Sequence, residues 1–334
     1  MRRRLPEGWS DPEVREDSIV ADGLTLRRAA LSATGPAGET VTSSAVDVAA
    51  SPSSRAYFEL LERVSTLLAI AQPPARYPLL TMEEVQVGER SAAEVFPVSE
   101  DPARWRFARS NGIALHEGWQ AASERALWEL AERDRVLRSW QGEILPQAHP
   151  IGSLPGPLLA TASYEWAAYT FRQSTKTSFS REVEVVGVFG FPNSDELPMV
   201  SGYAGRPTAE EALDAAVREA MQVLGFLWGE PPTPTDPDLQ PTPLHHLEHF
   251  QWPAHRTELR RWLAGEHAAY ERPDEPGSGP EPSNDVRFVD LTPAWLDSPL
   301  RVVKAVCDAA MPLAFGASPF FAHLPPALRV HPIA

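Results

Sequence analysis

The chain has 334 residues and a formal net charge of −15 at pH 7, which argues against nucleic acid as its main partner. Hydrophobic residues make up 43% of the sequence, enough for the core of one large domain or two modest ones. Cys307 is the only cysteine, so an intrachain disulfide and a cysteine-based zinc or iron–sulfur site are excluded.

The first residues are basic but have no apolar run behind them, which excludes a signal peptide. No segment approaches the ~18 uninterrupted apolar residues that a membrane helix needs. We therefore expect a cytoplasmic protein without a membrane partner.

The first half of the chain predicts strands and two helices. In chain order these are strands over 17–20 and 24–31, a helix over 53–70, a strand-like piece over 84–87 and a helix over 118–140. Serines at the start of the first helix offer N-caps, and Pro73-Pro74 ends it. The second helix carries an apolar stripe of Leu127, Leu130 and Leu137.

The second half mixes the same element types. In chain order we expect a helix-like or mixed segment over 157–172, a strand over 182–191, a turn over 202–205, helices over 208–228 and 255–267, and strands over 286–291 and 300–306. Thr208 and Glu211 give the third long helix a capping box. The proline-rich segments 229–243 and 272–284 read as loops. The predicted class is therefore α/β, or mixed α+β.

One five-residue pattern occurs twice, as Glu-Leu-Leu-Glu-Arg at 59–63 and Glu-Leu-Ala-Glu-Arg at 129–133. Residues three and four apart share a helix face, so each copy projects two carboxylates and a guanidinium together. Magnesium prefers oxygen ligands shared with substrate phosphates, and arginine matches phosphate geometry. The ordinary interpretation of one copy is a solvated face with ion pairs. Two copies at the same angle to their apolar stripes favour a shared metal–phosphate site.

Other candidate sites have simpler explanations. His245 and His249 have the one-turn spacing of zinc ligands, but no third ligand follows at a recognisable spacing. Cys307 is typical of a small buried residue rather than a nucleophile. Ser110-Asn-Gly112 reads as a turn that could also present backbone N–H groups to an anion. No P-loop or kinase signature is present, so a nucleotide site needs another design.

Residues 110–134 resemble the central motif of the YcaO family, which reads Ser-x-Gly-x-Ala, a fixed gap and Glu-x-x-Glu-Arg-Asp. Three further segments are similar to family segments in the same order. They are 59–65, the earlier Glu-x-x-Glu-Arg helix; 202–222, the later Glu-Ala-x-Gln helix; and 312–316 with His331-Pro332, the C-terminal segment. The resemblance implies a YcaO-like domain over 45–334, with residues 1–44 as strands and loops of the same domain.

The resemblance implies an ATP- and Mg2+-dependent enzyme that activates a backbone amide of a ribosomally made peptide. In the commonest family reaction a Cys, Ser or Thr side chain attacks the preceding carbonyl, ATP phosphorylates the oxyanion, and loss of phosphate gives a thiazoline or oxazoline. Carried over residue by residue, the metal-binding candidates are Glu59, Glu62, Glu129, Glu132 and Glu219. The same glutamates, with Arg63, Ser110, Arg133 and Gln222, are the nucleotide-binding candidates. His331 and Pro332 are the catalytic candidates.

The implied partners are a ribosomal precursor peptide, a separate E1-like or leader-peptide-binding protein and, for oxidation, a flavin dehydrogenase. A homodimer is left open as the assembly. The chain departs from the family pattern at several positions: Ala45, His116, Glu117, Ala121, Ala215 and the short tail His-Pro-Ile-Ala. These departures leave two alternatives to azoline formation. One is a thioamide-forming enzyme, and the other is a degenerate, non-catalytic subunit of a modifying complex.

Overall fold

The computed structural model describes residues 5–96, 111–150, 158, 161–174, 179, 183–230, 243–267, 285–296, 299–315, 321 and 324–333. Within them, the strands form three antiparallel sheets. The first sheet has the order β1-β2-β3, with bounds Glu13–Ala21, Leu24–Thr34 and Thr40–Asp47. The second has the order β10-β9-β8-β7, with bounds Val200–Arg206, Glu184–Pro192, Tyr164–Thr170 and Gln147–His149. The third has the order β5-β4-β11-β12-β6, with bounds Gln86–Ser91, Arg76–Leu80, Arg287–Asp290, Leu300–Val306 and Ile113–Glu117.

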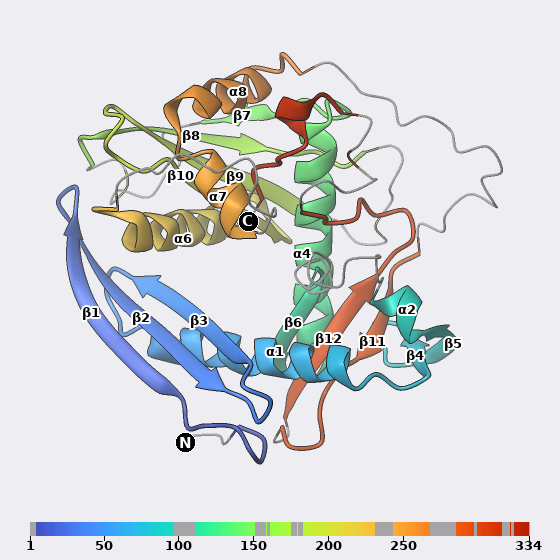
Figure 1. The fold of residues 1–334 in the computed structure, drawn as a ribbon. Coiled ribbons are helices and arrows are strands. Elements are labelled where there is room, and N and C mark those ends of the chain that lie inside the picture. Colours follow the sequence, from blue (N-terminus) through green and yellow to red (C-terminus); the bar gives the residue numbers. More distant parts are fainter. Residues whose placement is uncertain are drawn as a thin grey trace.

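Helices join these sheets, so the predicted mixed α/β class is confirmed. The described helices are α1 (Ser53–Ala71), α2 (Ala92–Val95), α4 (Trp119–Trp140), α6 (Ala209–Leu227), α7 (Pro243–His249), α8 (Pro253–Leu263) and the 3-10 helix η3 (Pro326–Leu328). In Figure 1, α4 stands upright near the middle, α6 crosses beside it, and α1 lies below. Among the helices described, none is long and apolar enough to cross a membrane.

Helix α1 packs on the first sheet through its apolar side. Leu60 and Val64 are buried against β2 and β3, in a cluster that includes Ala29 and Leu31. Their spacing of four residues places both on one helix face, as the sequence predicts. This packing leaves the glutamates of the first Glu-x-x-Glu-Arg copy on the side of α1 that meets the edge of β3.

Helix α4 lies between two sheets and is mostly buried. It packs on β6 and β12 of the five-stranded sheet and on β9 and β10 of the four-stranded sheet. The predicted stripe of Leu127, Leu130 and Leu137 is buried in the largest apolar cluster. Helix α6 covers β9 and β10 and also reaches β3. The three helices that carry glutamate candidates are thus brought together by three different sheets.

Several local predictions are wrong. Residues 164–170, in the segment expected to be helix-like or mixed, form β8, and β3 (Thr40–Asp47) is absent from the predicted strands. Residues 202–205 lie inside β10 rather than in a turn. The N-cap residue of α1 is Pro52, and no side chain caps the helix, so the predicted serine N-cap is wrong. The cap of α6 is confirmed, since Thr208 accepts a hydrogen bond from the Glu211 N–H at 3.2 Å.

Candidate active site

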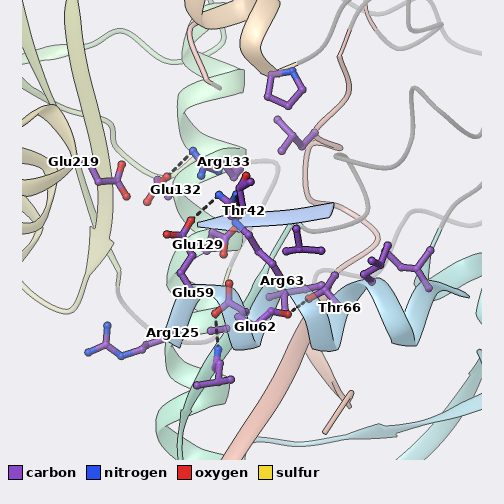
Figure 2. A pocket seen from close by; sticks show the side chains of 18 of the residues that line it. Thr42, Glu59, Glu62, Arg63, Thr66, Arg125, Glu129, Glu132, Arg133 and Glu219 are labelled. Atoms are coloured by element: carbon purple, nitrogen blue, oxygen red, sulfur yellow. Dashed lines mark hydrogen bonds and ion pairs between the residues drawn. The ribbon is translucent and has the colours of Figure 1, made fainter. Parts of the chain in front are cut away.

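A pocket of about 820 Å³ lies where α1, α4 and α6 meet β3 and β6. All five predicted glutamates and both arginines of the repeated motif line it: Glu59, Glu62, Arg63, Glu129, Glu132, Arg133 and Glu219. Figure 2 shows these side chains pointing into one space from three helices. The two copies of the motif, about 70 residues apart in sequence, therefore face a single site.

The two glutamates of α1 are each held by a backbone N–H of a neighbouring strand. Ser44 on β3 donates its N–H to Glu59 at 3.1 Å. Leu115 on β6 donates its N–H to Glu62 at 2.7 Å. A hydrogen bond from a fixed strand limits the rotamers of these flexible side chains, so their carboxylates are pre-positioned.

The other three glutamates are held in the same way. Tyr203 on β10 donates its N–H to Glu219 at 3.2 Å, and Gly205 on the same strand donates to Glu132 at 3.2 Å. Gly112, just before β6, donates its N–H to Glu129. Each of the five carboxylates thus accepts one main-chain hydrogen bond, although they come from three helices.

Two glycines explain how β10 reaches both helices. A Cβ atom at Gly205 would lie 2.4 Å from the carbonyl oxygen of Trp128 on α4. A Cβ atom at Gly202 would lie 2.2 Å from the carbonyl oxygen of Ala216 on α6. Such distances are too short for any side chain, so glycine permits the close approach of backbone to backbone. The same two glycines suggested a turn in the sequence.

The glutamate cluster holds more negative charge than its surroundings stabilise. Burial, then repulsion by Glu129, raises the pKa of Glu62 to about 8. Burial also raises the pKa of Glu132 to about 8, against the opposing charge of Arg133. Burial is the first cause of the raised pKa of Glu59, Glu129 and Glu219 as well. Carboxylates with raised pKa values gain stability from a nearby cation.

The glutamates of the pocket are compatible with a bound cation. The Oε1 atom of Glu132 is buried, lies 2.9 Å from the Arg133 guanidinium and accepts no well-aligned hydrogen bond. No group of three or more His, Cys, Asp or Glu side chains in the described part of the chain is placed to hold one ion by itself. Magnesium does not need such a cage, because it is normally held by one or two carboxylates together with water and substrate phosphates. The residues therefore fit Mg2+ that arrives with a phosphate ligand.

The predicted catalytic pair lies behind the pocket wall. His331 and Pro332 are buried and are not among the residues that line the pocket. The His331 Nε2–H donates to the Ala314 carbonyl at 2.9 Å, and the His331 carbonyl accepts a hydrogen bond from the His246 ring at 3.0 Å. Burial lowers the pKa of His331 to about 4. A catalytic role for this pair stays a prediction.

Two nucleotide-binding candidates also stay predictions. Gln222 lies on α6 outside the pocket lining, and its side-chain amide donates to the Ser44 Oγ at 3.5 Å. Ser110 lies outside the described residues, as do 231–242 and 272–284 of the proline-rich loops.

Three basic residues of the site were not singled out by the sequence. Arg125 and Arg206 line the pocket, and buried Lys304 donates to the Asn111 carbonyl at 2.5 Å beside Glu129. Arg125 precedes Glu129 by four residues, so helix periodicity could have placed it on the same face. Arg206 and Lys304 are brought in by strands distant in sequence, which no local pattern reveals.

The simpler explanations of the other candidates agree with the structure. His245 and His249 belong to no metal-holding group within the described residues. Cys307 is half-buried, and burial raises the pKa of its thiol, which disfavours a reactive thiolate.

The chain belongs to the YcaO family. The family model described as YcaO cyclodehydratase, ATP- and Mg2+-binding, matches residues 75–308. The cofactors predicted from the sequence are the two that this description names. No curated protein matches the sequence.

Solved structures share the fold at low sequence identity. YcaO from Methanopyrus kandleri, bound with AMPPCP and Mg2+, is 18% identical with a TM-score of 0.56, over 92% of this chain and 89% of that one. A chain of the E. coli microcin synthetase McbBCD complex with pro-MccB17 bound is 12% identical with a TM-score of 0.61, over 96% of both chains. A heterocyclase in complex with substrate and cofactor is 15% identical with a TM-score of 0.56, over 93% of this chain and 51% of that one.

Proposed function

We propose that this chain uses ATP and Mg2+ to activate a backbone amide of a peptide, in a cyclodehydration that converts Cys, Ser or Thr to a thiazoline or oxazoline. One observation carries the proposal. Five glutamates from three helices, each fixed by a main-chain N–H, surround one pocket in a member of the YcaO family. Membership of an ATP- and Mg2+-binding family supports these cofactors.

In this proposal the residues act by positioning and charge neutralisation. Glu59, Glu62, Glu129, Glu132 and Glu219 hold Mg2+ together with the triphosphate. Arg63 and Arg133 contact phosphate oxygens or orient the neighbouring carboxylates, and Ser110 and Gln222 complete the nucleotide site. The bound nucleotide supplies a phosphoryl group that turns the amide oxygen into a leaving group. Fixed carboxylates keep the cation in place at no reorganisation cost during the reaction.

The catalytic step needs a group for proton transfer. His331 and Pro332 remain the proposed catalytic pair, in which only the His331 imidazole can transfer a proton. His331 lies close enough to Arg133 for the arginine charge to affect its pKa. Burial keeps the ring neutral, and it packs on the rings of Phe315 and Phe321.

A second interpretation is a non-catalytic YcaO-like subunit, which the substituted positions Ala45, Ala121 and Ala215 favour. Ala45 and Ala215, where the resemblance leads us to expect charged side chains, are buried in apolar clusters. In either reading we expect a precursor peptide and a separate leader-binding protein as partners, with a flavin dehydrogenase where the azoline is oxidised. A homodimer and a cytoplasmic location also remain proposals.

Nucleotide binding separates the enzymatic readings from the non-catalytic one. Isothermal titration calorimetry should show ATP binding only with Mg2+, and Glu129→Gln should abolish it. Glu258→Gln, on α8 outside the pocket, is the matched control and should bind normally. Absence of Mg2+-dependent ATP binding in the wild type, with and without partner proteins, would contradict both enzymatic readings.

Mass spectrometry of the peptide separates the two enzymatic reactions. Cyclodehydration removes one water for each modified residue, whereas thioamide formation exchanges oxygen for sulfur and raises the mass. A mass gain of the peptide without loss of water would identify thioamide formation, rather than azoline formation, as the reaction.

A further inference from the structure

Two arginines lie over one tryptophan at one side of the pocket, and a third lies near them. Arg125 on α4 and Arg206 at the end of β10 both line the pocket. Their guanidinium carbons lie 5.7 Å and 5.3 Å from the ring centroid of Trp128. Arg218 on α6 is exposed and close enough for its charge to act on both. We call these four residues the arginine cluster.

The cluster makes no direct ion pair within the described residues. None of its three arginines forms an ion pair with a carboxylate there, and the side chain of Arg206 donates only to the carbonyl of the preceding Gly205, at 2.6 Å. The arginines of the repeated motif differ, since Arg63 and Arg133 both contact glutamates. The positive charges of Arg125 and Arg206 repel each other, and they are balanced without direct contact by Glu62 near Arg125 and by Glu132 and Glu219 near Arg206.

The cluster lies near the carboxylates without contacting them. Figure 2 shows Arg125 reaching away from Glu59 and Glu62, towards the side of the view on which Glu219 lies. Stacking near an indole ring holds a guanidinium by cation–π attraction while its N–H groups stay available.

We infer that the arginine cluster is an oxyanion subsite of the pocket, in which Arg125, Arg206 and Arg218 bind phosphate or carboxylate oxygens and Trp128 holds two of the guanidinium groups in place. Planar guanidinium groups bind both kinds of oxyanion in fork geometry. The bound oxyanion is either a phosphate of the nucleotide or a carboxylate of the substrate peptide, and this choice rests on the proposed function. The existence of the oxyanion subsite does not depend on that function.

A metal-free probe tests the subsite without the proposed function. Inorganic tripolyphosphate, titrated calorimetrically in the presence of a chelator, should bind the wild type and Glu129→Gln. The double variant Arg206→Gln/Arg218→Gln should bind it at least about tenfold more weakly, since each lost charge-assisted hydrogen bond costs about that factor. Arg261→Gln on α8, an exposed arginine, is the control and should bind like the wild type. Arg206→Lys keeps the positive charge but loses the planar, bidentate guanidinium group, so an intermediate affinity for tripolyphosphate is expected.

Two further titrations identify the source of the oxyanion. Weaker Mg2+·ATP binding by the double variant assigns the subsite to a nucleotide phosphate. Unchanged ATP binding with a raised KM for a peptide that carries Asp or Glu beside the modified residue assigns it to the peptide. Wild-type affinity of the double variant for tripolyphosphate, or no tripolyphosphate binding by the wild type, would overturn the inference. Loss of ATP binding alone in Glu129→Gln would leave it standing.

Discussion

The two copies of Glu-x-x-Glu-Arg have the same helix geometry but different surroundings. In α1 the side chain of Arg63 is 52% exposed; it pairs with Glu59 at 2.6 Å and donates to the Thr42 carbonyl at 2.7 Å. In α4 the side chain of Arg133 is 18% exposed and contacts Glu132 at 2.9 Å, while Glu132 is only 5% exposed. The difference arises because α1 borders a sheet edge whereas α4 lies between two sheets. The motif therefore determines which side chains share a helix face, and the packing around the helix determines how buried each Glu–Arg pair is.

The largest expected effect is on stability, and it should fall on the α4 copy. Arg133→Ala leaves buried Glu132 without its ion-pair partner and should lower the free energy of unfolding by about 3 kcal/mol. Arg63→Ala removes a half-exposed pair and should cost below about 1 kcal/mol. Urea denaturation of both variants without Mg2+ measures the difference. Equal losses would show that the two copies are equally embedded.

Cation binding should show the same ranking. Glu132→Gln should weaken Mg2+·ATP binding by about 100-fold, because Glu132 is deeply buried and is held in place by Arg133 and the Gly205 N–H. Glu59→Gln should weaken it by about tenfold, since Arg63 already neutralises part of its charge. Glu124→Gln, a third glutamate on α4 that does not line the pocket, serves as the control. A larger loss in Glu59→Gln would reverse the ranking.

The α4 copy also depends on close approach of β10. Gly205→Ala places a Cβ against the Trp128 carbonyl, which should lower the free energy of unfolding by about 1–3 kcal/mol. It should also displace the Gly205 N–H, which donates a hydrogen bond to Glu132. The added Cβ of Gly88→Ala would meet only the end of the Leu79 side chain at 3.9 Å, so this variant should be almost unchanged. Thermal unfolding and ATP titration of the two variants check both parts. Normal ATP affinity in Gly205→Ala would show that this hydrogen bond is dispensable.

The last expected effect is a pH dependence shared by both copies. Glu62 and Glu132 have pKa values of about 8 in the folded chain, above the ordinary value of 4.5. The folded protein therefore holds protons that the unfolded chain releases, and their stabilising contribution is lost as pH rises from about 5 to 8. Denaturation without Mg2+ should show a steeper decline in the wild type than in Glu132→Gln. Saturating Mg2+·ATP should remove the difference, and identical slopes without it would contradict the raised pKa.

The sequence was sufficient for the helices that carry the glutamates. Periodicity placed Leu60 and Val64 of α1 and Leu127 of α4 in the core, and this fixed the direction of the charged faces. It also indicated that the two faces share a site. These features depend on residues three and four apart, so a local pattern contains them.

The partners that complete the site could not be predicted in this way. Gly202 and Gly205 looked like a turn because glycine permits both positive φ and close approach, and only tertiary packing decides between them. Arg206 and Lys304 join the site through β10 and β12, whose places depend on sheet order. The five main-chain donors leave no trace in residue identity, because every residue except proline has an N–H group.

This last point has a consequence for how the site can change over time. At positions 44, 115 and 203 the donor is the peptide group, so any side chain except that of proline preserves the hydrogen bond to its glutamate. These three hydrogen bonds to the glutamates are therefore insensitive to most changes of side chain at the donor positions. Neighbouring side chains can differ without removing the main-chain groups that hold Glu59, Glu62 and Glu219.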